Sequence, residues 1–337
     1  MKPILPPLLL ALVTICLPGC QREEGQPSGR TRGEASRAAA AKKKADGSRA
    51  AASKKPPAAA KSIPTAEQLV AALKAKNPDF QGDVKVYAVP KSSDVSVEIH
   101  DPALKDVSPL ADLPVVMLDL SGCGASDIRP LAGLRLRVLV LSQCPVEDLG
   151  PLTDMALMGL YLEDTKVSDI SVLKDMPLAE LYLSNTKVKD ISALAGSPLE
   201  KLNLLGTQVS DLSPLRGSQL SMLWLNNCPV SDISPLKDVP LESLTLANTK
   251  VADLRPLKES GLRRLHIGGS EVTDLGPLQS LKLTRLIFTP SRITAGIEQV
   301  RAMKSLNELD TEFDPDNRPT LSPAEFWSLY DAGKFEK

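Results

Sequence analysis

The sequence has few aromatic residues for its size. Aromatic side chains make up only 3% of its 337 residues, whereas hydrophobic residues make up 42%. A chain of this length and hydrophobicity can bury a large core. The shortage of aromatic rings suits a core built from leucine, in which stacked coils share one continuous interior.

Histidine is scarcer still, which limits the catalytic chemistry available. The only two histidines are His100 and His266. The sequence has no histidine pair of the metalloprotease kind, no phosphate-binding loop and no nucleophile elbow. His100 and Cys123 lie about one repeat apart, but no third group is placed to orient such a pair, and Cys123 is expected to point inward. We therefore predict that the protein is not an enzyme and needs no cofactor.

The chain has almost no net charge, but its charge is unevenly distributed. Lysine and arginine number 40, against 41 aspartates and glutamates. The segment from Gln21 to Ile63 contains eleven basic and four acidic residues, which gives it a net charge of +7. The rest of the chain is therefore mildly acidic. Nucleic acid is accordingly not expected as a partner.

The beginning of the chain has the pattern of a targeting signal. The apolar run from Leu8 to Leu17 is shorter than the roughly 20 residues that a membrane-spanning helix needs. Leu17-Pro18-Gly19-Cys20 resembles the lipobox of bacterial lipoproteins, which implies cleavage after residue 19 and a lipid on Cys20. Because Gln21 stands where such lipoproteins carry an aspartate for inner-membrane retention, the resemblance further implies an outer-membrane or cell-surface location in the bacterial envelope. A plain secretory signal is the alternative.

Residues 20–63 are rich in alanine, lysine, arginine, serine, glycine and proline, and they almost lack large apolar side chains. Such a composition cannot offset the entropy cost of ordering, so a disordered basic tether is expected. Its positive charge could serve weak adhesion to anionic lipids or cell-wall polymers. A solvated spacer is the simpler interpretation, and we favour it.

One short phrase recurs at a strict interval of 21 residues across residues 97–291. A strict period in the range of about 20 to 50 residues indicates a solenoid. This repeated motif consists of an apolar residue, a variable residue and a second apolar residue. Its clearest copies begin at Leu118, Leu139, Leu160, Leu181, Leu202, Leu223, Leu244, Leu265 and Leu286.

The spacing within one coil predicts which side chains point inward. Period-two alternation sends Leu181 and Leu183 into the core and Tyr182 outward. Stacked copies of this strand would form a parallel sheet with a spacing of about 4.8 Å. The return limb is a bend such as Asp211 to Leu215, which should be wider than the strand and make the strand side concave. Each return limb brings three further apolar residues to the core. In the coil of Leu181 these are Val188, Ile191 and Leu194.

These residues resemble the leucine-rich repeats of the bacterial internalin-like class, with Leu-x-x-Leu-x-Leu followed by asparagine, threonine or cysteine and an Asp-Leu-Ser-Pro-Leu bend. The resemblance implies an α/β solenoid with a parallel β-sheet on its concave face and 21-residue coils, capped at both ends. It also implies a protein ligand on that face.

Both ends of the solenoid carry sequence signals for caps. In residues 64–96, Thr65 and Gln68 form a capping box, and strands are expected over Val84–Val89 and Val95–Ile99. In residues 292–337 the sequence predicts a helix over Ile293–Met303, a strand or extended piece over Leu306–Phe313, and a last helix opened by Ser322 and Glu325.

A column of aspartates recurs once per coil. Calcium between coils is one interpretation, since that ion takes six to eight oxygen ligands. We favour the other, in which each aspartate accepts backbone N–H bonds where its bend begins, and we expect no metal. The column is Asp106, Asp127, Asp148, Asp169, Asp190, Asp211, Asp232, Asp253 and Asp274.

Three cysteines, Cys123, Cys144 and Cys228, occupy the coil position that holds threonine or serine elsewhere. A small residue at an inward turn suits that position, so buried structural thiols are expected. Cys123 and Cys144 lie in neighbouring coils, where an oxidising compartment would permit a disulfide.

The outward strand positions form the candidate binding surface. They bring together three of the few aromatic residues, and exposed aromatic rings on a rigid surface are typical of protein contact sites. Glu163 and Asp164 should make one half acidic. Alternatively, the aromatic rings only support the side chains of neighbouring strands. A sugar that stacks on the rings is a further possible ligand. The candidate residues are Tyr161, Tyr182, Asn203, Trp224, Thr245 and His266, with Glu180 in the acidic half and Arg264 and Arg285 in the basic half.

Together these patterns predict a monomeric, lipid-anchored envelope scaffold that binds a protein or peptide on its concave face. A structural tether or spacer without a specific ligand and a glycan-binding surface protein are the alternatives. The outward residues differ from coil to coil while the inward leucines repeat, which favours recognition over a uniform spacer.

Overall fold

The structure is a computed structural model that describes residues 65–312 and 321–335. Every described residue belongs to one compact unit within Ala58–Lys337. The expected signal peptide, the tether and the lipid acceptor Cys20 lie outside the described residues. No helix within the described part is both long and apolar enough to cross a membrane.

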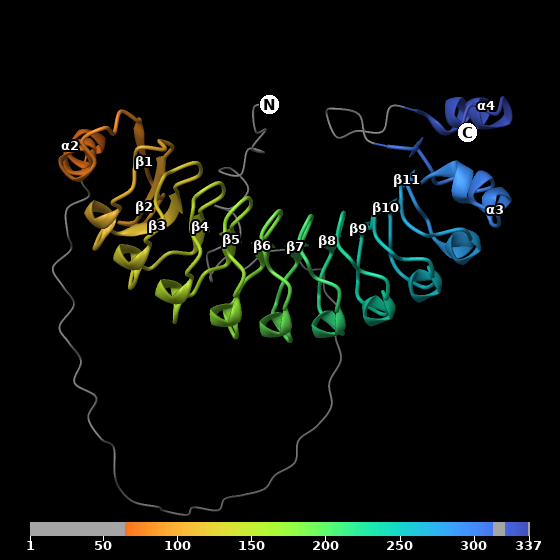
Figure 1. The fold of residues 1–337 in the computed structure, drawn as a ribbon, viewed down its shortest axis with the longest axis horizontal. Coiled ribbons are helices and arrows are strands. Elements are labelled where there is room, and N and C mark those ends of the chain that lie inside the picture. Colours follow the sequence, from red (N-terminus) through yellow and green to blue (C-terminus); the bar gives the residue numbers. More distant parts are fainter. Residues whose placement is uncertain (1–64, 313–320, 336–337) are drawn as a thin grey trace, which may run out of the picture. The chain divides into compact units, whose positions relative to one another are not determined.

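A single sheet of twelve strands follows the chain in sequence order (Figure 1). The first two strands form an antiparallel hairpin, and each later neighbouring pair is parallel. Leu139 lies opposite Leu160, and Leu160 opposite Leu181, so the repeat period sets the strand register. The strands are β1 (Val84–Ala88), β2 (Val95–Ile99), β3 (Val115–Asp119), β4 (Val138–Val140), β5 (Gly159–Tyr161), β6 (Glu180–Tyr182), β7 (Lys201–Asn203), β8 (Met222–Trp224), β9 (Ser243–Thr245), β10 (Arg264–His266), β11 (Arg285–Ile287) and β12 (Glu308–Asp310).

The coils return through short 3-10 helices, where the sequence predicts only a bend. Proline stands at the first or second position of most of them, which suits a helix start because proline has no N–H to leave unpaired. In Figure 1 the strands line the inner side of the curved repeat array and the 3-10 helices its outer side. These helices are Ser108–Leu110, Arg129–Leu131, Gly150–Leu152, Ser171–Leu173, Ser192–Leu194, Ser213–Leu215, Ser234–Leu236, Arg255–Leu257, Gly276–Ser280 and Pro290–Arg292.

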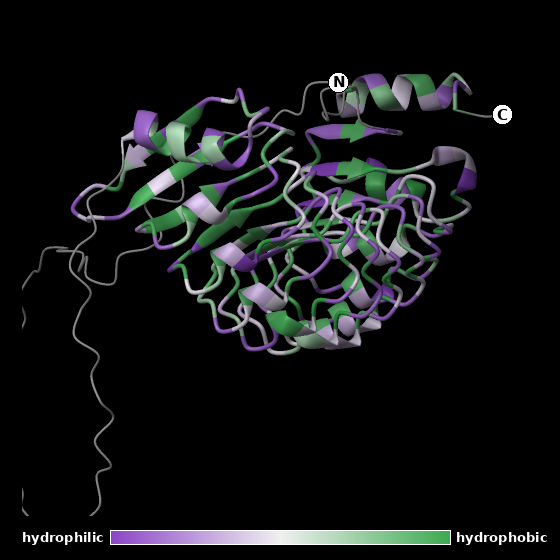
Figure 2. Cartoon of the chain, turned by 60° about the vertical axis from the view of Figure 1, so that its left-hand side comes forward, coloured by the Kyte–Doolittle hydropathy of each residue, from purple (hydrophilic) through white to green (hydrophobic). Residues whose placement is uncertain are grey.

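The core runs continuously through the array. Hydrophobic and hydrophilic residues follow one another within single strands in Figure 2, as expected when alternate side chains face opposite sides of a sheet. The leucines that open the nine clear repeat phrases are at most 1% exposed. Val188, Ile191 and Leu194 reach the same core from the return limb, with 3% exposure or less. The predicted inward pattern is therefore confirmed.

At the N-terminal end, helix α2 (Ala66–Lys76) and the β1–β2 hairpin cover the first coil. The capping box of Thr65 and Gln68 is present, and Leu69 and Leu73 are buried. Asn77 joins the helix end to the first coil, since its side chain donates to the carbonyl of Asp106 and accepts from the backbone N–H groups of residues 105 and 106.

The C-terminal end differs in part from the predicted pattern. Helix α3 spans only Ile297–Arg301, because Ala295 pairs with Asp274 of the preceding coil and Gly296 adopts a positive φ of 85°. Helix α4 (Pro323–Asp331) begins with the expected capping box of Ser322 and Glu325. Its fully buried Phe326 packs against Phe288 of the last clear repeat, with ring centroids 5.4 Å apart.

We expect Leu202→Ala to lower the free energy of unfolding by about 2 to 5 kcal/mol, because it opens a cavity in the middle of a core that cannot collapse around it. Leu202 is fully buried. Urea denaturation followed by circular dichroism measures the change. The control is Gln208→Ala, an exposed position in the same coil, for which a change of about 0.5 kcal/mol or less is expected. Equal effects of the two substitutions would contradict the continuous core.

Candidate binding surface

From β5 to β11 each strand has two outward positions, one on either side of its inward leucine. From β5 to β11 the first row is Gly159, Glu180, Lys201, Met222, Ser243, Arg264 and Arg285, and the second row is Tyr161, Tyr182, Asn203, Trp224, Thr245, His266 and Ile287. These two rows are called the outward face below. The structure thus places all nine candidate binding residues on one surface.

Three residues of the second row form an aromatic ladder, namely Tyr161, Tyr182 and Trp224. The two tyrosine rings stack with centroids 4.8 Å apart and an angle of 19° between their planes. Trp224 lies two coils beyond Tyr182, yet their centroids are only 6.0 Å apart. Asn203, between them in the row, is short, and its Oδ1 accepts the backbone N–H of Leu205 at 3.0 Å. Its side chain therefore bends back to its own strand and leaves room for the two rings.

The exposure of the ladder differs from the prediction. Tyr161 is only 5% exposed, whereas Tyr182 and Trp224 are partly exposed. Gly159 precedes Tyr161 on the same strand, and a Cβ there would lie 3.3 Å from the tyrosine ring. The ring therefore occupies space that a side chain at Gly159 would need, and Tyr182 covers its face. Tyr161 is thus a support for the ladder, as cross-strand pairs in sheets are.

The stacking also limits what the ladder can bind. A sugar ring normally packs on the open face of an aromatic ring. The face that Tyr182 turns to Tyr161 is occupied, and so is the matching face of Tyr161. Trp224 has Thr245 as its next neighbour in the row, and no ring of the described residues stacks on it from that side. Among the ladder residues, Trp224 is therefore the best placed to offer a ring face to a ligand.

The acidic half of the predicted binding surface is compensated in part by its own residues. Glu180 accepts a hydrogen bond from the Tyr161 hydroxyl at 2.5 Å and pairs with Lys201 Nζ at 2.8 Å. Glu163 accepts a bond from the Ser142 hydroxyl at 2.5 Å, and burial raises the pKa of its carboxyl. Burial also raises the pKa of the Tyr161 phenol, and its bond to Glu180 adds to that effect. Glu180 is therefore compensated by a cation, whereas Glu163 is bound by a neutral hydroxyl and the exposed Asp164 by the side-chain amide of Asn185.

The basic half is less basic than the residue types suggest. Burial lowers the pKa of His266 to about 4, so its imidazole is neutral at pH 7. Arg285 forms an ion pair with Glu308 of β12. Arg264 has no carboxylate within salt-bridge distance among the described residues. It is thus the cation of the outward face whose charge stays uncompensated.

His100 and Cys123, the pair considered from the sequence, have different polar partners. His100 Nε2 lies 3.2 Å from Asp119 Oδ2, and that contact raises the pKa of the imidazole. The Cys123 thiol donates inward to the carbonyl of Ile99 at 3.2 Å, and burial raises its pKa to about 11. Cys144 is likewise buried, and both cysteines are free thiols in this structure. The prediction of buried structural thiols is confirmed.

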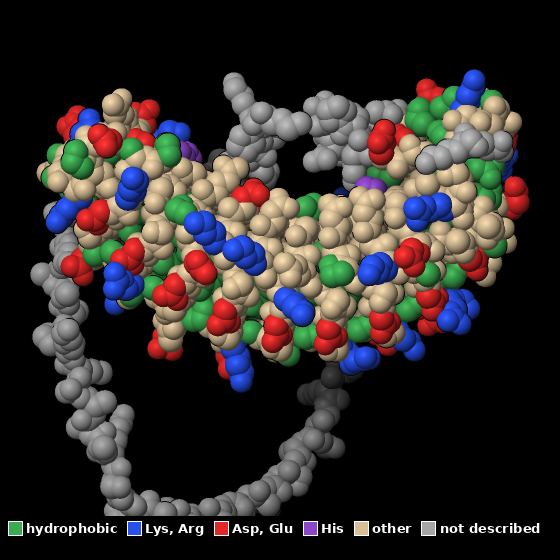
Figure 3. Space-filling model, in the orientation of Figure 1, with side chains coloured by type: hydrophobic (Ala, Val, Ile, Leu, Met, Phe, Trp, Pro, Cys, Tyr) green, Lys and Arg blue, Asp and Glu red, His purple; other side chains and the backbone are tan. Residues whose placement is uncertain are grey.

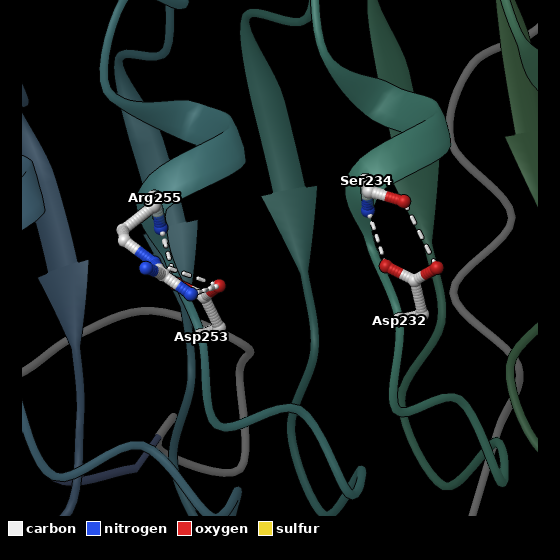
Figure 4. A network of polar contacts seen from close by, with 4 residues as sticks. All are labelled: Asp232, Ser234, Asp253 and Arg255. Carbon is white, nitrogen blue, oxygen red and sulfur yellow. Dashed lines mark hydrogen bonds and ion pairs between the residues drawn. The ribbon is translucent and has the colours of Figure 1, made fainter.

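The aspartate column lies on the outer side of the array and caps the 3-10 helices. In each of the nine coils Oδ1 accepts the backbone N–H two residues further on, at 2.7 to 3.0 Å. Asp232 binds both the N–H and the hydroxyl of Ser234, and Asp253 binds Arg255 (Figure 4). Acidic and basic side chains are interspersed over the face that Figure 3 shows. Within residues 65–312 and 321–335, no group of three or more candidate ligands is placed to hold a metal ion.

The polar partners that organise the outward face were not predicted from the sequence. Lys201, Ser142 and Glu308 each bind an acidic or basic group of this region, and each belongs to the coil next to its partner. The signal was available for Lys201 and Ser142, because residues 21 apart in the repeat region are neighbours in the register, whereas Glu308 lies 23 residues after Arg285.

The fold and this surface define a leucine-rich repeat solenoid, and known structures share the fold. An internalin (inlF) from Listeria monocytogenes superposes with a TM-score of 0.54 at 24% identity, covering 66% of this chain and 69% of that one. A plant ice-binding protein has a TM-score of 0.51 at 14% identity, covering 75% and 86%. Internalin C2 of Listeria monocytogenes has 26% identity and a TM-score of 0.45, over 52% and 80%. No family model and no curated protein matches the sequence.

The two histidines should titrate in opposite directions from their ordinary value of 6.5. We expect a pKa of about 4 for His266, because burial disfavours its charged form, and a value above 6.5 for His100, because Asp119 stabilises the imidazolium. His266 therefore reduces stability as the pH falls below 6.5, whereas the contribution of His100 is lost as the pH rises through its own pKa. NMR titration of the two imidazoles measures both values, and His100→Gln assigns the signals. The reverse order would contradict the structure.

Proposed function

We propose that this protein is an envelope-located scaffold that binds a protein or peptide on its outward face without catalysing a reaction. The observation that carries the proposal is the aromatic ladder, in which Tyr182 and Trp224 stay partly exposed on a sheet whose strands are held on both sides. Aromatic side chains of this kind bury much area at little entropic cost when a partner docks.

The surface is ordered before any ligand arrives, which favours binding. Tyr161 and Lys201 hold Glu180, and Tyr161 in turn supports Tyr182. Side chains that are already fixed lose less freedom on association, so more of the contact free energy remains for affinity. The leucine-rich repeat resemblance supports the same conclusion, because it implies a protein ligand on the strand side.

The outward side chains vary from coil to coil, which a uniform spacer would not need. The second row changes from tyrosine to asparagine, tryptophan, threonine and histidine along five successive coils, while the inward leucines stay constant. A glycan ligand would have to use Trp224 alone among the ladder residues, since the tyrosine pair stacks on itself. A protein segment, which can use edges and side-chain pockets together, fits the surface better.

We further propose that the chain is anchored through a lipid on Cys20, which would place the solenoid at the outer membrane or cell surface. The support is the sequence Leu17-Pro18-Gly19-Cys20 after a short apolar run. The basic residues 21–63 would then join the anchor to the solenoid. The scaffold would bind its partner as a monomer.

The double substitution Tyr182→Ala plus Trp224→Ala should strongly reduce capture of the partner from envelope extract. Loss of two buried aromatic contacts predicts at least a tenfold reduction, since such residues each contribute about 2 kcal/mol or more at contact sites. The measurement is a quantitative pull-down with the full chain in detergent.

The matched control is Lys189→Ala plus Lys237→Ala, which removes two long exposed side chains from the outer side of the array. A partner that both double variants capture equally well would move the binding site away from the ladder. If neither the unaltered chain nor the aromatic variant captures any partner, the spacer alternative is supported.

Cys20→Ser should release the protein from the membrane fraction, because the lipid acceptor is lost. Metabolic labelling with a radioactive fatty acid should mark the unaltered chain and leave the variant unlabelled. Cys228→Ser, at a buried thiol of the solenoid, serves as the control and should keep its label. Equal labelling of the Cys20→Ser variant would refute the anchor.

A further inference from the structure

The outward face has one cation that its own residues leave uncompensated. In the two rows from β5 to β11 the lysines and arginines are Lys201, Arg264 and Arg285. Lys201 pairs with Glu180, and Arg285 pairs with Glu308. Arg264 has no ion pair or side-chain hydrogen bond to any described residue, although it is partly buried. A partly buried guanidinium has five N–H donors to satisfy.

A second polar group without a partner, the Thr245 hydroxyl, lies one coil away. The Thr245 hydroxyl is buried, with the residue only 7% exposed, and it has no hydrogen-bond partner among the described residues. A buried hydroxyl without a partner is uncommon in native structures and calls for an explanation. Its neighbours in the row are Trp224 on one side and His266 on the other.

The register places these groups close together. Arg264 lies opposite Ser243, and His266 lies opposite Thr245, on the neighbouring strands β10 and β9. With strands about 4.8 Å apart, the Cα atoms of Arg264 and Thr245 are separated by about 8 Å along the diagonal. A group held above β9 would therefore lie beside the indole of Trp224 and meet the guanidinium directly. It would meet the Thr245 hydroxyl, which is shielded in the unbound protein, once the side chains around that hydroxyl move aside.

We propose that Arg264, Thr245 and Trp224 form a subsite for a carboxylate of the partner, carried by an aspartate or glutamate in an acidic protein segment. This inference rests on the proposed function and specifies the chemistry of the ligand. The carboxylate accepts a paired hydrogen bond from the guanidinium and another from the threonine hydroxyl, while the apolar part of the segment packs on Trp224.

A basic segment fits the same surface poorly. Glu180 is engaged by Lys201 and the Tyr161 hydroxyl, and Glu163 is engaged by Ser142. A cationic ligand would find Glu180 already paired with a cation, whereas an anionic ligand meets an arginine that is free to bind it. His266 adds no competing charge, because its imidazole is neutral at pH 7.

Peptide selection tests the proposal whatever the natural partner is. The probe is a library of random 15-residue peptides displayed on phage, selected on the immobilised full chain and counter-selected on the Tyr182→Ala plus Trp224→Ala variant. We expect enrichment of aspartate or glutamate next to an apolar residue. Selected sequences are then synthesised as peptides, each with a glutamine or asparagine version of its acidic residues.

Three variants separate a role in binding from a role in stability. Arg264→Gln should weaken binding of the acidic peptides at least tenfold, and it should not affect the glutamine or asparagine versions. Arg263→Gln removes the same charge at the adjacent exposed position and should change affinity less than twofold. Thr245→Val removes the unpartnered hydroxyl, so it should leave the urea midpoint unchanged or higher while binding falls by about threefold or more.

The outcomes distinguish this inference from the proposed function. Peptides that require Trp224 but bind Arg264→Gln as well as the unaltered chain would leave the scaffold proposal standing and overturn the carboxylate subsite. Enrichment of basic peptides would overturn it as well. If no peptide is enriched over the aromatic double variant, or if a glycan array shows binding only to acidic sugars, the protein-ligand proposal and the subsite both fail.

Discussion

The structure depends on the burial of leucine at a fixed period, together with the backbone hydrogen bonds that join each coil to the next. Leu202 and Leu204 are fully buried, and the strand that carries them bonds to both neighbours, as in the bonds from Leu183 N to Asn203 O and from Leu204 N to Trp224 O. A shift of one residue would turn the whole inward set to solvent. No coil can be stable alone, so the strict period is a condition for any folded state.

That constraint also builds the outward face. Because inward residues must stay in register, outward residues of successive coils are forced to lie side by side at the strand spacing. The two tyrosines stack for this reason, and Glu180 meets Lys201 for the same reason. Charges that face an opposite charge in the next coil are neutralised. Charges without such a partner, of which Arg264 is the clearest, mark where a ligand of opposite charge can gain most binding free energy.

Features set by local chemistry could be predicted, and features set by neighbouring coils could not. The capping boxes of α2 and α4 and the aspartate caps involve residues two or three apart, so the pattern alone identified them. The short α3 was not foreseen, because Gly296 packs against the backbone of the preceding coil. Tyr161 was expected to be exposed, but the space above Gly159 and the cover of Tyr182 bury it.

The sequence by itself determined the repeat, the direction of every strand side chain and therefore the membership of the outward face. These follow from two periods, alternation within a strand and 21 residues between strands, which do not depend on side-chain conformation. Only the tertiary structure decided which of those residues are accessible and which charges remain. Both depend on how side chains from three adjacent coils share the space above the sheet, as Asn203 shows when it bends away and lets Tyr182 meet Trp224.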